Sequence, residues 1–466
     1  MSWLTKTSSP ARALVATVLL VAPFLGCAPS SDPAAPRPNV LLVTLDTLRG
    51  DRLGSYGYHR DTSPFLDSLA AEGLLFTRAY SVSSWTVPSM ASLFTGLYPE
   101  SHGVAHGLVQ KGTIFGQEVL SDEYSLLTEL LEQAGYRTFG ITASLHLASE
   151  FGFSQGFDHY ENVGFASADK VSPILESMKE EILQGDGPYF LWLHLFDPHD
   201  PYHPRQPWIE RYFPEPEAAT KLDMMSPRTL RRSRREHRGN EEKPFARVLE
   251  FAQASYDSEI NYTDRAVRSA FETLRVSPED LIVITSDHGE EFLEHRDFGH
   301  AETLFEEQVR IPLIVRLPGK AHAGRIIEEP VSILDILPSL LGWLHVDPPE
   351  AIHGRSFLAG LEETPLPARP LYLSLSRPRT DLNSILVGDW KYIRDDRKAG
   401  KHKLFDLNND PEERTNLVGL ESARASELAR ELSEHLAMAE SQRLESSLQQ
   451  VPPETVERMR ALGYVD

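Results

Sequence analysis

The stretch VLLVTLD at residues 40–46 is a continuous apolar run that ends in a carboxylate. A run without polar alternation is typical of a strand buried on both faces, as in the middle of a parallel sheet. Similar runs occur at residues 136–142, 189–196 and 281–285, with helical patterns such as 126–134 and 258–274 among them. Strands that alternate with helices predict an α/β fold, in which a large, mostly parallel sheet is flanked by helices on both faces.

Acidic residues directly follow three of the predicted strands, at Asp46, Asp197 and Asp287. In open α/β sheets, ligands bind beyond the carboxyl ends of the strands. We therefore expect these carboxylates to converge on one site at that edge of the sheet.

The pattern changes after Gly342 to short strands and turns at 371–375, 384–387, 390–393 and 403–406, followed by a helical pattern at 422–439. This change predicts a main α/β domain over 38–345, a smaller C-terminal sub-domain over 346–440 with an antiparallel sheet and a helix, and a tail over 441–466. A basic run interrupts the main domain, and we expect a solvated insertion near 226–240. A substrate-facing role for this run is the less favoured alternative.

The N-terminal residues differ in composition from the predicted fold. Lys6 and Arg12 precede an apolar run at 13–25, which is too short to span a bilayer comfortably and is followed by Gly26 and Cys27. This arrangement resembles a bacterial lipoprotein signal, which implies removal of residues 1–26 and lipidation of Cys27. Residues 27–37 are then a flexible tether. The expected location is the cell envelope, with the chain anchored to a membrane by lipid at the periplasmic face or the cell surface. The alternative is a plain signal peptide with an incidental cysteine.

Charge and cysteine content exclude several classes of function. The net charge of −22 argues against a role in binding nucleic acid. An anionic substrate would have to be attracted by local cations or a metal. Cys27 is the only cysteine, so no intramolecular disulfide can form and no second thiolate is present for metal binding or catalysis.

Short motifs occur along the chain in a characteristic order. They are DTLRGD (46–51), WTVPSMASLFTG (85–96), PHDPY (198–202), SDHGEE (286–291), RIPLIV (310–315), WKY (390–392) and LFDL (404–407). Each motif alone is weak, but in this order, over residues 38–418, the chain resembles the sulfatase family of the alkaline-phosphatase superfamily. The resemblance implies that family's fold, with residues 38–345 as the catalytic domain, a divalent metal and the cleavage of a sulfate or phosphate ester.

Asp46, Asp287 and His288 are the candidate metal ligands. A divalent cation in a catalytic site is held by carboxylate and imidazole groups around an open position, and these residues supply such a set from two strand ends. For a lone buried aspartate, a cap or salt bridge would be the ordinary interpretation. The imidazole favours Zn²⁺ or Mn²⁺, with Ca²⁺ or Mg²⁺ as alternatives.

Thr86 occupies the position of the family's nucleophile, just before Pro88, which suits the first turn of a helix over 89–95. The N–H groups of that helix would face the substrate anion. A hydroxyl beside a metal loses its proton more easily, so Thr86 is a candidate for both metal ligand and nucleophile. The alternative role for Thr86 is to cap the helix with its hydroxyl, and the two roles are compatible.

Several positions depart from the family's pattern. Sulfatases carry Cys or Ser at the place of Thr86 and oxidise it to formylglycine; oxidation of threonine would give a ketone, so we expect no formylglycine here. Met90 replaces an Arg, Thr47 replaces a second Asp ligand of many sulfatases, and His288 replaces the commoner Asn. This combination is similar to the superfamily's phosphodiesterases and its phosphoethanolamine and lipoteichoic-acid transferases, which shifts the expected chemistry towards phosphorus.

Three further residues occupy positions that the family uses. The resemblance implies that His199 contacts the ester oxygens. His300 stands where sulfatases place a Lys that grips the sulfate, and it resembles transferase histidines that bind a second zinc or protonate the leaving group. Arg49 could orient Asp46, touch the anion or form a structural ion pair. Structural or solvent-exposed roles are favoured for the other nearby histidines, which are His194, His203 and His295.

The leading hypothesis is a metal-dependent hydrolase that forms a covalent intermediate on Thr86. Threonine chemistry favours a phosphoester or phosphonate substrate, whereas the family resemblance favours a sulfate ester. The alternatives are a phospho-group transferase and a catalytically inactive envelope binding protein. We expect the substrate to be a small-molecule, glycan or lipid ester.

Overall fold

A computed structural model describes residues 37–106, 108–111, 114–214, 225–236, 242–361, 366–398, 400–444 and 447–461. The predicted signal peptide, Cys27 and almost all of the tether lie outside the described residues. Among the residues that are described, no helix is both long and apolar enough to cross a membrane.

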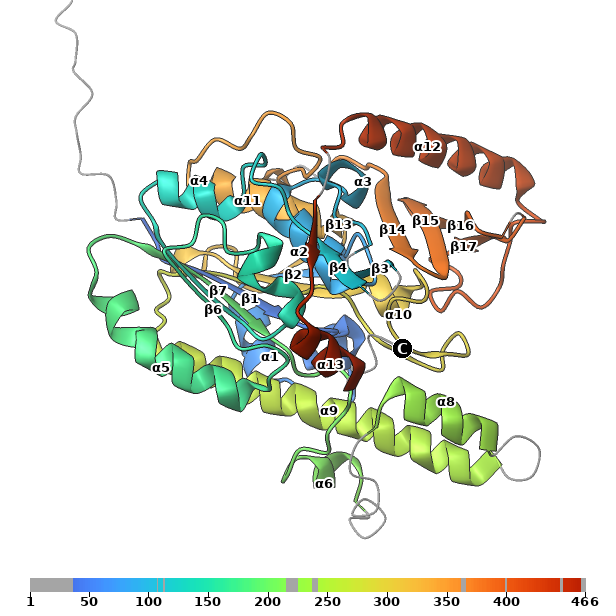
Figure 1. The fold of residues 1–466 in the computed structure, drawn as a ribbon, viewed down its shortest axis with the longest axis horizontal. Coiled ribbons are helices and arrows are strands. Elements are labelled where there is room, and N and C mark those ends of the chain that lie inside the picture. The colour runs from blue at the N-terminus through green and yellow to red at the C-terminus, as the bar shows by residue number, and fades with distance from the viewer. Residues whose placement is uncertain are drawn as a thin grey trace, which may run out of the picture. The chain divides into compact units, whose positions relative to one another are not determined.

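The predicted catalytic domain is built on a nine-stranded sheet in the order β12-β2-β11-β8-β1-β7-β5-β6, with β13 also paired to β2 (Figure 1). The run from β8 to β6 is parallel, β11 is antiparallel to both β8 and β2, and β12 and β13 are parallel to β2. The predicted large, mostly parallel sheet is therefore confirmed. The strands are β1 (Val40–Leu45), β2 (Leu74–Tyr80), β5 (Arg137–Thr142), β6 (His159–Asn162), β7 (Tyr189–Leu195), β8 (Leu281–Ser286), β11 (Arg310–Arg316), β12 (Arg325–Ile327) and β13 (Val331–Ser332).

The two faces of the sheet pack into separate cores. On β1, Val40 and Leu42 join one core, whereas Leu41, Val43 and Leu45 join the other, as alternation along a strand requires. Helices α2 (Thr86–Thr95), α3 (Pro99–His102), α4 (Leu127–Gln133) and α11 (Ile336–Trp343) lie on the first side. Helices α1 (Pro64–Ala71), α5 (Ala168–Gln184), α6 (Ile209–Tyr212) and α9 (Glu242–Thr273) lie on the second.

The basic run is a helix and not only a solvated segment. α8 (Pro227–Glu236) packs beside α9 and next to the two-stranded sheet of β9 (Glu291–Phe292) and β10 (Phe298–Gly299). Leu230 is fully buried, and Arg231 donates to Asp297 Oδ1 and to the carbonyl of Phe298. These contacts fix residues 227–236 to the catalytic domain, close to the loop that carries His300.

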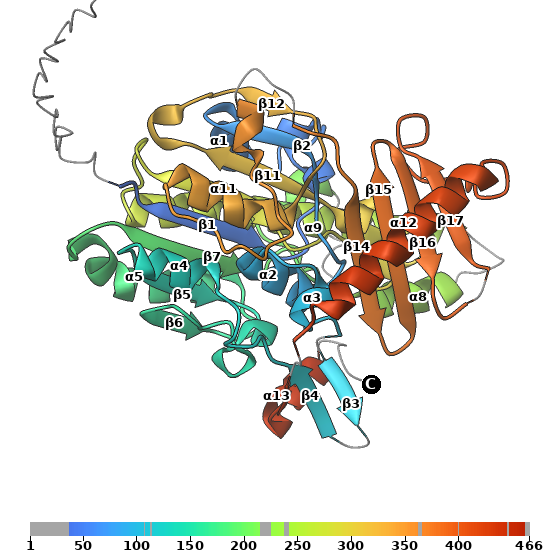
Figure 2. The same cartoon turned by 90° about the horizontal axis from the view of Figure 1, so that it is seen from above.

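The C-terminal sub-domain is a four-stranded antiparallel sheet with one long helix (Figure 2). Its elements are β14 (Leu371–Arg377), β15 (Thr380–Val387), β16 (Trp390–Asp395), β17 (His402–Asp406) and α12 (Ser422–Ser441). Leu428 and Leu432 of α12 pack on Ile385 and Leu404, while Leu373 on the opposite face joins the core of the catalytic domain. Short α10 (Glu306–Val309) also meets this sheet, through an ion pair with Lys391.

The segment predicted as a tail has regular structure in its described part. β18 (Leu448–Gln450) pairs with β4 (Ile114–Glu118), which pairs with β3 (Leu108–Lys111), and α13 (Pro453–Ala461) follows. Val451, Val456 and Met459 are buried, which accounts for the order of this segment.

Candidate active site and metal centre

Two of the three predicted carboxylates meet where strands β1 and β8 end. Asp46 follows β1, Asp287 follows β8, and both are buried. The third, Asp197, does not join them, and the prediction that all three converge is wrong on this point. Its Oδ2 accepts from the backbone N–H of Ala168, the first residue of α5, at 2.9 Å, and it forms an ion pair with Arg205. Asp197 therefore stabilises the first turn of α5.

Thr86 and His288 complete the cluster around these carboxylates. His288 Nε2 lies 3.3 Å from Thr86 Oγ1, 3.4 Å from Asp287 Oδ2 and 3.8 Å from Asp46 Oδ1. The ligand atoms of Asp46, Asp287 and His288 all lie within 4.8 Å of one another. The structure therefore brings together all four residues predicted to hold the metal.

The donor atoms in this cluster are oriented by neighbours that bind their other atoms. The backbone N–H groups of Thr47 and His288 donate to Asp287 Oδ1 at 3.1 and 2.9 Å, which leaves Oδ2 to face the cluster. His288 Nδ1 lies 2.9 Å from the carbonyl of Gly289, so Nδ1 carries the proton and Nε2 the lone pair. Asp46 Oδ1 and Asp287 Oδ2 accept no hydrogen bond of ordinary geometry within the described chain. Orphaned buried oxygens beside an imidazole lone pair are what a divalent cation requires.

The pKa shifts of Asp46 and Asp287 also favour a bound cation. Burial raises the pKa of Asp46 well above its ordinary value, and the charge of Asp287 raises it further. The pKa of Asp287 is lowered despite burial, because His288, His194 and the nearby hydroxyl of Thr86 stabilise its charge. Burial and mutual repulsion therefore disfavour ionisation of both carboxyl groups together, and a bound cation would stabilise both carboxylates.

Helix α2 presents Thr86 to this cluster. Thr86 is the first residue of α2, one turn earlier than the predicted start, and every residue of the helix is buried. The first N–H groups of a helix lack intrahelical acceptors, and its positive end favours an anion. The hydroxyl of Thr86 thus lies where a substrate anion would meet both the metal ligands and the helix end.

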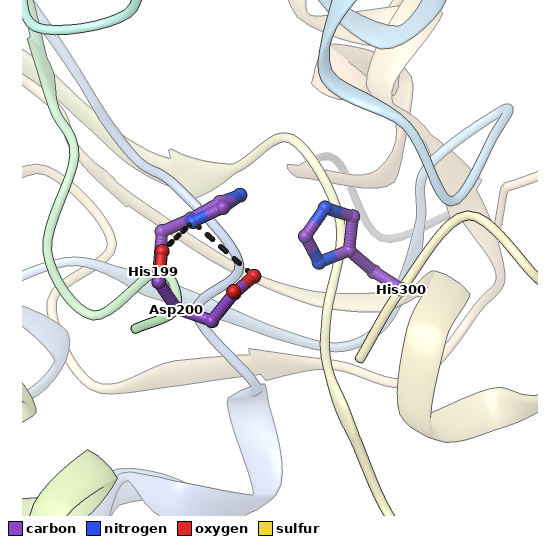
Figure 3. Close-up of side chains that lie close together, drawn as sticks. All are labelled: His199, Asp200 and His300. Atoms are coloured by element: carbon purple, nitrogen blue, oxygen red, sulfur yellow. Dashed lines mark hydrogen bonds and ion pairs between the residues drawn. The ribbon is translucent and has the colours of Figure 1, made fainter. Parts of the chain in front are cut away.

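A second group of candidate ligands lies next to the first. His199 and Asp200 come from the loop after β7, and His300 follows β10; their ligand atoms also lie within 4.8 Å of one another (Figure 3). The ring centroids of His288 and His300 are 4.6 Å apart, which makes the two groups neighbours. Burial lowers the pKa of both His199 and His300 well below the ordinary value, so both rings are neutral near pH 7. His199 and His300 therefore lie beside the first group, and their catalytic or substrate-binding roles remain predictions.

The contacts of Arg49 favour its structural alternative. Its guanidinium donates to Asp51, to Glu294 and to the carbonyl of Glu290. Its backbone N–H also donates to Tyr256. Arg49 therefore stabilises the loop that carries Glu290 and Glu294.

The weaker histidine candidates are also placed. His194 is fully buried; its Nδ1 lies 2.8 Å from Thr44 Oγ1 and its Nε2 lies 3.6 Å from Asp46 Oδ2. His295 contacts Glu307 through Nδ1 and the carbonyl of Glu413 through Nε2. His203 lies by a separate cavity of about 520 Å³, lined by Arg205 and other residues.

Sequence reasoning assigned no role to three residues that the fold brings to the site. Asp200 and Glu290 stand inside quoted motifs, directly beside candidate residues, and that position was the available signal. Arg377 is the third: it ends β14 of the C-terminal sub-domain, and its guanidinium lies 3.8 Å from the centroid of the Trp85 ring. No local signal in the sequence links Arg377 to a site about 290 residues earlier.

Comparison with known proteins agrees with this geometry. Residues 38–346 match the family described as Sulfatase, and residues 294–442 match the family described as N-sulphoglucosamine sulphohydrolase, C-terminal. The chain is 30% identical to human N-sulphoglucosamine sulphohydrolase, over 72% of this chain and 67% of that protein. It is 26% identical to an ulvan-active sulfatase of Formosa agariphila, over 82% of this chain and 77% of that protein.

Solved structures show the same fold at lower identity. The phosphonate monoester hydrolase of Agrobacterium radiobacter superposes with a TM-score of 0.67 at 21% identity, over 90% of this chain and all of that one. BT4656, solved in complex with its substrate D-glucosamine-2-N,6-O-disulfate, superposes with a TM-score of 0.67 at 20% identity, over 87% of this chain and 98% of that one. The family match spans well over half of the chain, and the chain therefore belongs to the sulfatase family of ester hydrolases.

Proposed function

We propose that this sulfatase-family hydrolase cleaves phosphate diesters or phosphonates through a covalent intermediate on Thr86. The observation that carries the proposal is the position of the Thr86 hydroxyl, 3.3 Å from His288 Nε2 at the start of α2. The same Nε2 lies 3.4 Å from Asp287 Oδ2 and 3.8 Å from Asp46 Oδ1, the two unsatisfied oxygens of the cluster.

In this proposal, Asp46, Asp287 and His288 hold a divalent cation, with Zn²⁺ or Mn²⁺ favoured by the imidazole ligand. When bound, the cation supplies Lewis-acid stabilisation of the attacking hydroxyl and the ester oxygens. Thr86 Oγ1 forms the new bond to phosphorus as the bond to the leaving alcohol breaks. The N-terminus of α2 stabilises the charge on the equatorial oxygens, and water then displaces Thr86.

Threonine is the reason for preferring phosphorus to sulfur. A formylglycine hydrate releases sulfate by re-forming its aldehyde, without attack at sulfur, and a threonine ester lacks that exit. Water must then attack the intermediate directly, which phosphoryl centres held by metal and N–H groups undergo readily.

A sulfuric ester is the second candidate, and the names of the relatives support it better than they support a phosphoester. Two of them are named as sulfatases or sulphohydrolases, and one related structure holds a sulfated sugar as its substrate. A phosphonate monoester hydrolase among the structural neighbours supports the first candidate. The alcohol part of the substrate is proposed to be a glycan, lipid or small molecule.

Turnover of matched aryl sulfate, phosphate diester and phosphonate, with sulfated sugars alongside, tests the proposal on metal-replete protein. We expect kcat/KM for the phosphorus esters to exceed that for the sulfates by at least ~10²-fold, about 2.7 kcal/mol in barrier. Thr86→Ala should abolish this turnover. Thr95→Ala is the matched control, because Thr95 ends the same helix and its hydroxyl bonds to the carbonyl of Ala91 and the N–H of Leu97. Efficient sulfate release without phosphoester turnover would establish the second candidate instead.

A further inference from the structure

We propose that an arginine cluster beside His300, formed by Arg231, Arg377 and Arg379, binds a second anionic group carried by the alcohol part of the ester. Arg231 belongs to the basic helix α8, Arg377 ends β14, and Arg379 lies in the turn before β15. This inference rests on the proposed ester hydrolysis and deepens it, because it names a substrate class. The substrates are esters of alcohols that bear a carboxylate, sulfate or phosphate of their own.

Strand β14 places Arg377 against the residue that precedes the candidate nucleophile. The guanidinium carbon lies 3.8 Å from the centroid of the Trp85 ring, and Trp85 directly precedes Thr86. Leu373 and Leu375 of the same strand are buried in the core shared with the catalytic domain, which fixes the strand. Stacking engages the flat face of a guanidinium, whereas its N–H donors lie in the plane and match the oxygens of a carboxylate, sulfate or phosphate. Arg377 can therefore bind an anion while it remains stacked.

The charge of Arg377 also acts on two histidines of the site. Burial, with the charge of Arg377 added, lowers the pKa of His146 to about 3. His146 follows β5, and its ring centroid lies 5.1 Å from that of Trp85. The pKa of His300 is lowered first by burial, and the charges of Arg377 and Arg231 contribute. Arg377 is therefore close to the residues that follow β5 and β10 as well as to the start of α2.

Helix α8 brings Arg231 to the loop that carries His300. Arg231 Nε donates to Asp297 Oδ1 and Nη2 donates to the carbonyl of Phe298, both at 2.6 Å. Nη2 also lies 4.0 Å from Glu302 Oε1, and the side chain of Arg231 is 38% exposed. The basic run that forms α8 thus places a solvent-accessible cation beside this loop.

The carboxylate of Glu302 lies among the charges of the arginine cluster. Burial raises the pKa of Glu302, and the charges of all three arginines oppose that shift. The side chain of Glu302 is 48% exposed, so an anionic group of a ligand can approach the same charges from solvent. The whole chain has a net charge of −22, and local cations are needed to attract a substrate with two negative charges. The arginine cluster supplies this local attraction.

A matched pair of substrates measures this recognition. 3-Carboxyphenyl and 3-carbamoylphenyl methylphosphonate differ in the charge of the alcohol part and little in its size, and the corresponding pair of aryl sulfates is assayed alongside. On the metal-replete full chain at low ionic strength, we expect kcat/KM to favour the carboxylate about tenfold or more, as for a charge-assisted hydrogen bond. The preference should decrease as the ionic strength rises.

Substitutions in the cluster should change this preference in opposite directions. We expect Arg377→Gln to reduce it to about twofold or less and Arg231→Gln to reduce it severalfold. Glu302→Gln should increase it severalfold, because removal of a negative charge strengthens the attraction of the cluster for an anion. Arg268→Gln is the matched control and should keep the wild-type preference, since Arg268 is an exposed arginine of α9 that pairs with Glu272. Circular dichroism checks that each variant is folded.

Calorimetric titration with the free alcohols, 3-hydroxybenzoate and 3-hydroxybenzamide, gives the same comparison without turnover. Equal kcat/KM and equal affinity for the charged and the neutral compounds would overturn the arginine cluster. An equal loss for both compounds in Arg377→Gln would also overturn it, because Arg377 would then have only a structural role. Turnover of the sulfate pair alone, with a preference that depends on Arg377, would instead overturn the proposed phosphorus chemistry and support the arginine cluster.

Discussion

Lys391 connects the C-terminal sheet to the catalytic domain through a buried ion-pair cluster. Its side chain is fully buried, and its Nζ lies 2.9 Å from Glu306 Oε1 and 3.0 Å from Glu413 Oε1. Lys391 belongs to β16, whereas Glu306 begins α10 of the catalytic domain. Lys391→Met keeps most of the side-chain volume but leaves the buried carboxylate of Glu413 and the partly buried carboxylate of Glu306 without their cation.

The expected destabilisation follows from burial and depends on pH. Removing one partner of a buried ion pair costs about 3–5 kcal/mol, and we expect the free energy of unfolding to fall by that amount in mildly alkaline buffer. Burial raises the pKa of Glu413 to about 7 even beside Lys391, and loss of Lys391 would raise it further. A carboxyl whose pKa is higher in the folded state destabilises the fold as the pH rises through that range. The loss should therefore be smaller in mildly acidic buffer, where Glu413 is protonated.

Urea unfolding followed by circular dichroism at several pH values measures this effect. Lys320→Met is the matched control, because Lys320 pairs with Glu72 at 2.8 Å but both side chains are more than a third exposed. We expect the control to lose only about 0–1 kcal/mol. Adding Glu306→Gln and Glu413→Gln to Lys391→Met should recover part of the stability. Equal effects of the two lysine variants, or a loss at Lys391 that does not change with pH, would refute the reasoning.

Three further changes test the site and the anchor. Gly289→Ala would place a Cβ 2.2 Å from the carbonyl oxygen of Glu307, so we expect the loop that carries His288 to shift. The affinity for Zn²⁺ should then fall about tenfold or more, as measured by calorimetric titration. An unchanged affinity would contradict this expectation. Arg377→Gln removes the cation stacked on Trp85 beside the nucleophile, and we expect a severalfold higher KM for esters carrying a second anionic group, with little change for neutral alcohols. Cys27→Ala should release the chain from the membrane fraction and abolish palmitate labelling; a variant that remains as firmly bound would exclude the lipid anchor.

Local patterns in the sequence were sufficient for much of the fold. The buried strands β1, β7 and β8 are continuous apolar runs, and hydrophobicity along a strand is a local property that needs no knowledge of its neighbours. The same holds for the short strands and long helix of the C-terminal sub-domain. The pairing of the strands could not be predicted in this way. That β11 is antiparallel to both neighbours, and that β18 joins β4, depends on contacts between residues far apart in the chain.

The first metal group was readable from the sequence because its members sit directly after strand ends, where the chain must leave the sheet at a common edge. That reasoning could not separate Asp46 from Asp197, since the difference lies in a hydrogen bond to the start of α5. The second group needed the tertiary structure. His300 and Asp200 are a hundred residues apart, and only the packing of two loops brings them within ligand distance. Arg377 reaches the site because the apolar face of β14 docks on the catalytic core, and it is long-range apolar burial that decides this contact.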